Sequence, residues 1–404
     1  MNQGALARRA AGLSTAFPAP HFPSELDADV IAFDSGFAYP KVLPELSQFA
    51  VNALSAHREE SLQYAPPQGS PELRDWIAGY MNADGCRVTG DHILIVGGAK
   101  HGIDLICRLL LDEGDSLVVT APTYFTCIPI FRSFGAHVLE VDHDAEGLRV
   151  DSLAALFTRL KATGTALPKF VYNVVDFHNP TGATMTLARR EALVDLCARE
   201  GVFIVEDNPY RRVRFTGEAV PTLKALDRDD TVIHVGTFSK LIAPGLRIGW
   251  VTAHPQLIAR MMQLKSDGGA CPFTQRIIYD FCRSGAFEAH VTKVQAVYRE
   301  HRDRMLAAVR RWLPNATIDE PDGGYYLWLD FQPGFDGDAF AAEAAARKVN
   351  ILAGSRFFAG PGGGYPRNRG PAANSVRLSY SYETLARIDE GVERLARIYA
   401  KMAA

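Results

Sequence analysis

A lysine in a turn of small residues is the first candidate for chemistry in this sequence. Lys240 lies in VGTFSKLIAPGLRIGW, residues 235–250, between two apolar runs. A lysine partly removed from water loses its charge more readily, and its amine then serves as a nucleophile, a base or a Schiff-base partner. Taken singly, such a lysine is usually just solvated. Lys240 therefore needs partners before it can be given a catalytic role.

Groups suited to phosphate surround this lysine in the sequence. Thr237 and Ser239 place two hydroxyls beside it, and Arg247 offers a guanidinium that matches a phosphate. The segment IVGGAKHGIDL, residues 95–105, is typical of a strand, a glycine turn and a helix start. The first amides of such a helix form an anion site, and here they belong to Gly98, Ala99 and Lys100. The sequence predicts a phosphate held from two sides.

The same glycine turn has a second interpretation as a dinucleotide-binding loop. Gly97, Ala99 and Gly102 approximate the spacing G-x-G-x-x-G after a strand. However, the second position is alanine, and the next strand, SLVVTAP, ends without the acidic residue that binds a ribose. These two departures disfavour a Rossmann dehydrogenase.

Further candidates follow strand-like runs, where ligands of open α/β sheets collect. Asp207 ends VFIVED and opens EDNPY, Asn179 lies in FHNPTG, and Tyr124 lies in PTY. Each has a structural alternative, because Asp207 could cap the next turn and Asn179 could be a turn residue before Pro180. Each of these residues is ambiguous by itself.

The elements that must position these residues alternate between strands and helices. Strand-like, mostly continuous apolar runs occupy 92–98, 116–122, 170–177, 202–207, 231–238 and 246–253. Such runs are typical of strands buried on both faces of a largely parallel sheet. Helical periodicity between them, as in 186–200 with Gly201 at its end, predicts a doubly wound α/β sheet.

The pattern of predicted helices and strands changes after about residue 287. A long helix, a strand-like GGYYLWLDF, a short helix, the runs VNILAG and VRLSYS and a last helix predict a second, α+β domain. We expect an N-terminal arm with part of the small domain in residues 1–50, a large domain in 51–286 and a small domain in 287–404.

Taken together, the motifs PTY, NPTG, EDNPY, SK followed by PGLR, and RL at 377–378 resemble the class I/II aminotransferases. These are pyridoxal 5′-phosphate enzymes of fold type I, and the resemblance spans roughly residues 30–400. It implies a large domain with a mostly parallel, seven-stranded sheet and a smaller α+β domain. Within the family, the sequence most resembles the 2-aminoadipate and aromatic aminotransferases and the catalytic-like domain of MocR-type regulators.

The resemblance implies a role for each motif residue. Lys240 would form a Schiff base with the cofactor and move the proton, Asp207 would pair with the pyridine nitrogen, and Tyr124 would stack on the ring. Asn179 and Tyr210 would bind the ring's 3′ oxygen. The phosphate would be held by Gly98, Ala99, Lys100, Ser239, Arg247 and Thr237. Tyr64 would reach the cofactor of a neighbouring subunit, which implies a homodimer with a shared active site.

The implied reaction is ping-pong transamination between an L-α-amino acid and a 2-oxo acid. Arg377 would clamp the substrate α-carboxylate, with Gly36 and Asn179 beside it. Phe37 and Tyr39 favour a substrate with an apolar or extended side chain. A lyase, synthase or cyclising enzyme of the same fold is the alternative, because the fold supports several reactions. A ligand-sensing regulator domain is a third possibility, which the short stretch before residue 30 disfavours.

Composition excludes several other classes. With 404 residues, 47% hydrophobic residues and a net charge of −3, the chain is typical of a compact soluble protein. It has no dense basic stripe for nucleic acid and no run long enough for a signal peptide or membrane span, so we expect a cytoplasmic protein. Six dispersed cysteines without CxxC spacing predict buried thiols and no metal site.

Three positions depart from the family pattern. His178 precedes NPTG where glutamine is frequent, and His101 lies in the phosphate turn; we expect both to pack or form hydrogen bonds. The insertion GPGGGYPRNRG, residues 360–370, is interpreted as a surface loop or as a lid that brings Arg367 and Arg369 to an acidic substrate.

Overall fold

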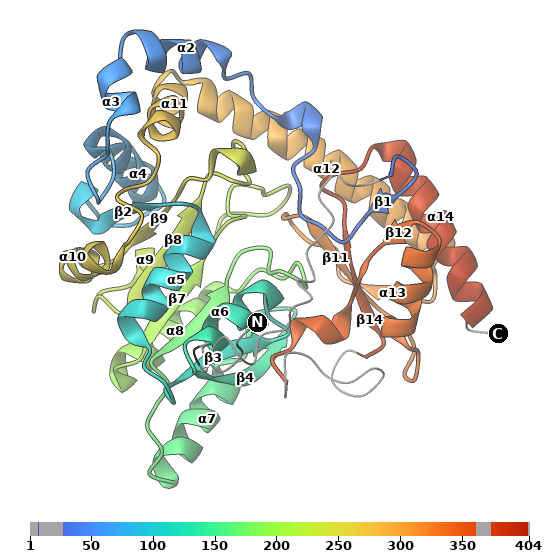
Figure 1. Cartoon of the computed structure of the whole chain (residues 1–404). Helices are drawn as coiled ribbons and strands as arrows, with labels where there is room; N and C mark the ends of the chain where they lie inside the picture. Colours follow the sequence, from blue (N-terminus) through green and yellow to red (C-terminus); the bar gives the residue numbers. More distant parts are fainter. Residues whose placement is uncertain (1–6, 8–26, 361–372, 403–404) are drawn as a thin grey trace.

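The computed structural model describes residue 7, residues 27–360 and residues 373–402. Figure 1 shows a large sheet surrounded by helices and, beside it, a smaller group of strands and helices from the C-terminal part of the chain. Most of the insertion at 360–370, including Arg367 and Arg369, lies outside the described residues. Within them, no helix has the length and hydropathy needed to cross a membrane.

The large sheet contains eight strands among the described residues, in the order β2-β9-β8-β7-β6-β3-β4-β5. Their bounds are β2 Ile93–Val96, β3 Ser116–Ala121, β4 His137–Asp144, β5 Gly147–Leu148, β6 Phe170–Val174, β7 Phe203–Asp207, β8 Val232–Thr237 and β9 Gly249–Thr252. The neighbours β8-β7-β6-β3-β4 are parallel, whereas β9 is antiparallel to both β2 and β8. The six strands predicted from the sequence are confirmed, in a mixed sheet to which β4 and the two-residue β5 are added.

Both faces of the large sheet are buried, as the continuous apolar runs predict. Leu117 and Val119 of β3 belong to one hydrophobic cluster, and Val118 between them belongs to another. Tyr172 and Val171 of β6 divide between the two clusters in the same way. Since successive strand residues point to opposite faces, each cluster is the core beneath one helical layer.

The helices around the large sheet belong to the first three-quarters of the chain. They are α2 Ser47–Ser55, α3 Arg58–Leu62, α4 Pro71–Ala83, α5 Ala99–Leu110, α6 Ile128–Ser133, α7 Val150–Ala162, α8 Leu187–Glu200, α9 Leu223–Leu226, α10 Pro255–Leu264 and α11 Pro272–Arg283. The helix predicted at 186–200 is α8, and Gly201 ends it in the left-handed conformation with φ 67°. Five of the six cysteines are buried free thiols, and Cys271 is exposed.

The C-terminal part forms a second, antiparallel sheet in the order β10-β11-β14-β13. Its elements are α12 Ala286–Trp312, β10 Thr317–Ile318, β11 Tyr326–Asp330, α13 Gly337–Ala346, β12 Val349–Asn350, β13 Leu352–Ala353, β14 Ser375–Ser379 and α14 Leu385–Met402. β1, Ile31–Ala32, pairs in parallel with β12, so the N-terminal segment joins this part of the fold. The domain boundaries given above stay a prediction.

Candidate active site

The predicted site residues come from the carboxyl ends of strands in the large sheet. Gly98 follows β2, Tyr124 follows β3 and Asn179 follows β6. Asp207 is the last residue of β7, and Lys240 follows β8. Because β3, β6, β7 and β8 are adjacent and parallel, their carboxyl ends meet at one edge of the sheet.

The Lys240 amine is held by a carbonyl from the N-terminal segment. Its Nζ donates a hydrogen bond to the Gly36 carbonyl oxygen at 2.7 Å. The ring centroids of Tyr325 and Tyr210 lie 5.0 and 6.0 Å from Nζ. Burial lowers the pKa of Lys240, and Tyr326 partly opposes that shift. The amine therefore becomes neutral more readily than a solvated lysine.

Asp207 is a buried acid with one oxygen left without a donor. Its side chain is almost fully enclosed, and Oδ2 accepts a hydrogen bond from the Tyr172 hydroxyl at 2.6 Å. Among the described residues no donor reaches Oδ1. Burial raises the pKa of Asp207 to about 6, although the bond from Tyr172 opposes the shift. A buried acceptor of this kind fits a ligand that brings a cationic N–H group.

The glycine turn and Arg247 form one side of the predicted phosphate cradle. Arg247 Nη2 donates to the Gly97 carbonyl at 3.0 Å. Gly98 has φ 93°, and a Cβ at this position would lie 2.6 Å from Arg247 Nη2, so only glycine lets the two segments approach. One expectation is wrong: the Gly98 N–H is not free, because it donates to the Val96 carbonyl at 2.8 Å. The amides in the first turn of α5 have no partner inside the helix, and they include those of Ala99 and Lys100.

The turn before Lys240 forms the other side of the cradle. Thr237 Oγ1 donates to Ser239 Oγ at 2.9 Å and accepts a hydrogen bond from the Ser239 amide at 3.1 Å. These bonds fix the turn that ends β8 and begins the segment with Lys240. Lys100 Nζ lies 5.9 Å from the centroid of the Tyr124 ring, which places Tyr124 beside the start of α5.

Arg377 lies on β14 and faces the large sheet. It is buried, its Nη1 donates to Asn179 Oδ1 at 2.9 Å, and its Nη2 donates to the Asp34 carbonyl oxygen. Its Nε finds no acceptor within residues 27–360 and 373–402. The guanidinium also lies 4.0 Å from the centroid of the Tyr326 ring. A guanidinium with a free N–H group in a dry site is suited to a carboxylate.

Tyr64 does not join the other predicted residues within one chain. It follows α3, and its side chain is 88% exposed. Tyr210 lies in the loop after β7 and donates from its hydroxyl to the Tyr326 hydroxyl at 3.3 Å. The two histidines form hydrogen bonds, as expected. His178 hydrogen-bonds with Thr120 and Thr181, at 3.2 and 2.9 Å. His101 Nδ1 accepts a hydrogen bond from the Gly97 amide at 3.1 Å.

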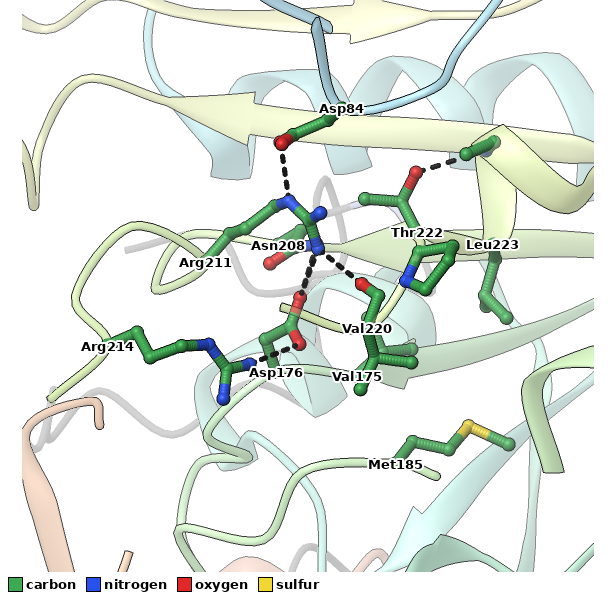
Figure 2. A network of polar contacts seen from close by, with 12 residues as sticks. Asp84, Val175, Asp176, Met185, Asn208, Arg211, Arg214, Val220, Thr222 and Leu223 are labelled. Atoms are coloured by element: carbon green, nitrogen blue, oxygen red, sulfur yellow. Dashed lines mark hydrogen bonds and ion pairs between the residues drawn. The ribbon is translucent and has the colours of Figure 1, made fainter. Parts of the chain in front are cut away.

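A buried ionic network supports the loop that carries Tyr210. Figure 2 shows Asp176, which follows β6, at the centre of this network. Asp176 accepts hydrogen bonds from Arg190 at 2.7 Å, Asn208 at 3.0 Å and Arg211 at 3.4 Å. Burial by itself raises the pKa of Asp176, but Arg190 and Arg211 outweigh it and hold that pKa below its ordinary value. The network ties the segment after β7 to the segment after β6.

Sequence reasoning missed Tyr172 and Tyr326, which contact the predicted residues. Tyr172 is the polar-tipped side chain inside an apolar strand, and a buried phenol needs a partner. That signal could have identified it as a neighbour of the acid on the next strand. Tyr326 lies in GGYYLWLDF, where the sequence does not distinguish it from core aromatics such as Tyr325.

The donors and acceptors of this site fit pyridoxal phosphate. Asp207 Oδ1 is placed to accept from a protonated pyridine nitrogen, and Lys240 carries an amine that can react with the aldehyde. Arg247 and the start of α5 supply cationic and N–H groups for the phosphate. A mixed α/β sheet with these groups at its carboxyl edge defines a pyridoxal phosphate-dependent enzyme of fold type I.

Comparison with known proteins agrees with this class. Residues 26–395 match the model of the family "Aminotransferase class I and II". The aromatic-amino-acid aminotransferase 1 of Thermococcus litoralis is 32% identical over 91% of this chain and 88% of its own length. The crystal structure of a multiple substrate aminotransferase from Thermococcus profundus is 32% identical, covers 98% of both chains and superposes with a TM-score of 0.90.

A third relative was solved with a cofactor derivative. The α-aminoadipate aminotransferase LysN of Thermus thermophilus, complexed with N-(5′-phosphopyridoxyl)-L-leucine, is 30% identical over 93% of both chains, with a TM-score of 0.84. Proteins named as HTH-type transcriptional regulators are also among the matches. The chain belongs to the class I and II aminotransferase family, and it is a pyridoxal phosphate-dependent aminotransferase.

Proposed function

We propose that this aminotransferase passes the amino group of an L-α-amino acid to a 2-oxo acid in two half-reactions, with Lys240 as the proton carrier and Arg377 as the carboxylate site. One observation carries the proposal. Lys240 donates to the Gly36 carbonyl, and Arg377 donates to the Asp34 carbonyl. The proposed base and the proposed carboxylate-binding group, which must act on one small substrate, are thus anchored to backbone carbonyls that lie two residues apart.

Lys240 has the position and protonation that this chemistry needs. When bound, pyridoxal phosphate accepts the electron pair left at Cα after the Cα–H bond breaks. Lys240 Nζ takes that proton with its lone pair, becomes an ammonium group, and gives the proton up later in the half-reaction. The lowered pKa of Lys240 favours the neutral amine required for the first transfer.

The remaining residues bind and orient. Asp207 Oδ1 would accept from the ring nitrogen and keep it protonated, and Tyr124 would cover one ring face. Asn179 accepts a hydrogen bond from Arg377 with its side-chain oxygen, so its Nδ2 group would donate to the 3′ oxygen, beside the Tyr210 hydroxyl. The residues proposed to hold the phosphate are Ala99, Lys100, Thr237, Ser239 and Arg247.

Aromatic side chains near Arg377 support a substrate with an apolar or extended side chain. The Phe357 ring lies 5.1 Å from the Arg377 guanidinium and 5.1 Å from the Phe125 ring. The names of the relatives, aromatic-amino-acid and α-aminoadipate aminotransferase, agree with this class. Of the two aromatics in the sequence prediction, Phe37 contacts Tyr382 at 5.9 Å, whereas Tyr39 packs on helix α12.

We also propose a homodimer in which Tyr64 completes the cofactor site of the second copy. Five of the eight large hydrophobic side chains that are exposed among the described residues lie in or near α2 and α3. They are Tyr64 (88% exposed), Leu62 (62%), Val51 (58%), Leu54 (46%) and Leu43 (44%). Exposed large apolar side chains that concentrate in one part of a fold are typical of an interface.

Subunit mixing tests the dimer. A chain with Tyr64→Ala keeps Lys240, and a chain with Lys240→Ala keeps Tyr64, so each mixed dimer would contain one complete site. Refolding the two inactive variants together should restore roughly one quarter of the wild-type activity. Mixing each variant with itself is the control. Failure to restore activity in a protein that is dimeric by light scattering would contradict a shared site.

An amino-donor screen tests the reaction. Purified protein with pyridoxal phosphate should show a visible band that amino acids remove while a 2-oxo acid appears, and that an acceptor 2-oxo acid restores. The Lys240→Ala variant should lack the wild-type band. Release of ammonia with an unchanged band would instead indicate an elimination reaction.

A further inference from the structure

Tyr326 lies where the two sheets meet and has no part in the proposal above. It is the first residue of β11 and is 4% exposed. Its ring faces the Arg377 guanidinium at 4.0 Å, on the side of the carboxylate site. Its hydroxyl accepts a hydrogen bond from the Tyr210 hydroxyl at 3.3 Å, on the side of the large sheet. One side chain therefore borders both halves of the site.

Gly36 shows how close the Tyr326 hydroxyl is to the reactive amine. A Cβ placed on Gly36 would lie 2.2 Å from Tyr326 Oη and 3.4 Å from Lys240 Nζ. The phenol oxygen and the amine thus border the same small space, which a glycine leaves open. Lys240 also donates to the Gly36 carbonyl at 2.7 Å, so the amine is anchored on the side where Tyr326 stands.

Resting on the proposed function, we propose that Tyr326 is a further catalytic residue, whose hydroxyl hydrogen-bonds with Lys240 Nζ and holds the free amine at the substrate Cα during proton transfer. A phenol has one donor proton and two acceptor lone pairs. One lone pair accepts from Tyr210, so the proton and the second lone pair remain for the amine. Tyr326 keeps its proton throughout, and the proton that moves travels between Cα and Lys240 Nζ.

The charges around Lys240 agree with this role. Besides burial, Arg377 on β14 and Arg247 on the phosphate side both disfavour the ammonium form of Lys240. Taking a proton from Cα turns the amine into an ammonium ion with a third N–H group. A hydroxyl acceptor beside Nζ stabilises that ion when it forms.

Tyr326→Phe tests the inference, because it keeps the ring beside Arg377 and removes only the hydroxyl. We expect kcat to fall by about tenfold to a hundredfold while KM for the amino acid stays within a factor of about two. Proton transfer should become slower, so the kinetic isotope effect with substrate deuterated at Cα should increase. A purely structural role would change KM or the melting temperature and leave the isotope effect unchanged.

Tyr325→Phe is the matched control. The Tyr325 ring lies 5.0 Å from Lys240 Nζ, but its hydroxyl donates to the Lys240 backbone carbonyl at 3.3 Å. Removing this hydroxyl takes a hydrogen bond from the backbone of the same lysine and leaves the amine untouched, so the isotope effect should keep its wild-type value. An equal increase of the isotope effect in both variants would overturn the role of Tyr326.

A readout on the resting enzyme separates this inference from the proposed function. The visible band of the loaded enzyme titrates with pH, and in Tyr326→Phe its midpoint should move to lower pH by roughly half a unit, since a hydroxyl acceptor favours the protonated nitrogen. If the wild type does not transaminate, the proposed function fails and this titration still reports on Tyr326. If Tyr326→Phe keeps the kcat, the isotope effect and the titration midpoint of the wild type, the inference is wrong.

Discussion

Two buried aspartates at the ends of neighbouring strands differ in how completely their oxygens are satisfied. Asp176 follows β6, has no exposed side-chain surface, and accepts hydrogen bonds from two arginines and an asparagine. Asp207 ends β7, accepts one bond from Tyr172 and keeps Oδ1 free of any donor among the described residues. Their pKa values shift in opposite directions, downward for Asp176 and upward to about 6 for Asp207.

The difference separates a structural acid from one available to a ligand. Asp176 receives more positive charge than it carries and stabilises the fold that presents Tyr210 (Figure 2). Asp207 is held by one neutral donor, so a cationic ligand can complete its hydrogen bonding. Asp176 and Asp207 are buried to a similar depth. The number and the charge of their hydrogen-bond donors distinguish the structural acid from the acid of the candidate site.

The largest expected effect is on stability, from Asp176→Ala. This change leaves Arg190 and Arg211 buried without their shared acid, and removing one partner of a buried pair costs about 3–5 kcal/mol. Urea denaturation should show this loss in the free energy of unfolding. Asp144→Ala, which breaks a partly exposed pair with Arg189, is the control and should cost about 0–1 kcal/mol. Equal losses in the two variants would contradict the comparison.

The next effect is on activity, from Asp207→Asn. The amide cannot keep a pyridine nitrogen protonated, so kcat should fall by about 10²–10³-fold or more. The melting temperature should stay close to that of the wild type, in contrast with Asp176→Ala. Steady-state kinetics and thermal denaturation together check this contrast. If Asp207→Asn kept its activity but lost stability, Asp207 would be a structural acid and the comparison would be wrong.

A third effect concerns the pH dependence of stability in the cofactor-free protein. The folded-state pKa of Asp207, about 6, lies above its ordinary value of 3.8. Its contribution is therefore complete below about pH 4 and lost as pH rises through about 6, a change of up to about 3 kcal/mol. Asp176 has the opposite sign, and its contribution is lost as pH falls. Between about pH 4 and 7, the free energy of unfolding of the wild type should therefore fall relative to that of Asp207→Asn. Denaturation of both proteins across this pH range measures the difference.

The smallest effect is expected from Tyr172→Phe. Removing the hydroxyl that binds Asp207 Oδ2 withdraws a donor from the charged form, so the pKa of Asp207 should rise. The acidic limb of the pH–rate profile should move upward by roughly half a unit to one unit. Cys127→Ala, which removes a thiol 3.6 Å from the Tyr172 hydroxyl, is the control. An unchanged acidic limb in Tyr172→Phe would show that this bond does not tune Asp207.

Much of this site follows from the sequence because its residues lie in short motifs after apolar strands. Asp207, Asn179 and Lys240 were found in this way, and the structure brings them to one edge of the sheet. Strand β4 was missed because polar residues interrupt HVLEVDHD near the sheet edge, so that it does not form a continuous apolar run. The strands predicted from continuous runs are the ones buried on both faces.

The contacts that could not be predicted join residues far apart in the chain. The backbone carbonyls of Asp34 and Gly36 have no side-chain signature, yet they accept from Arg377 and Lys240. Tyr326 reaches Tyr210 only because the small sheet is set against the large one. Such contacts depend on the relative placement of two sheets, which local patterns do not encode.

The segment from Asp34 to Gly36 also acts as a spacer of fixed length. Its two carbonyls accept hydrogen bonds from Arg377 and Lys240, the residues proposed for carboxylate binding and proton transfer, and neighbouring Cα atoms of a chain are about 3.8 Å apart. The covalent length of the segment thus sets the distance between recognition and proton transfer. Inserting one residue there would lengthen that distance without altering either side chain, so the enzyme would hold a substrate that its base no longer reaches.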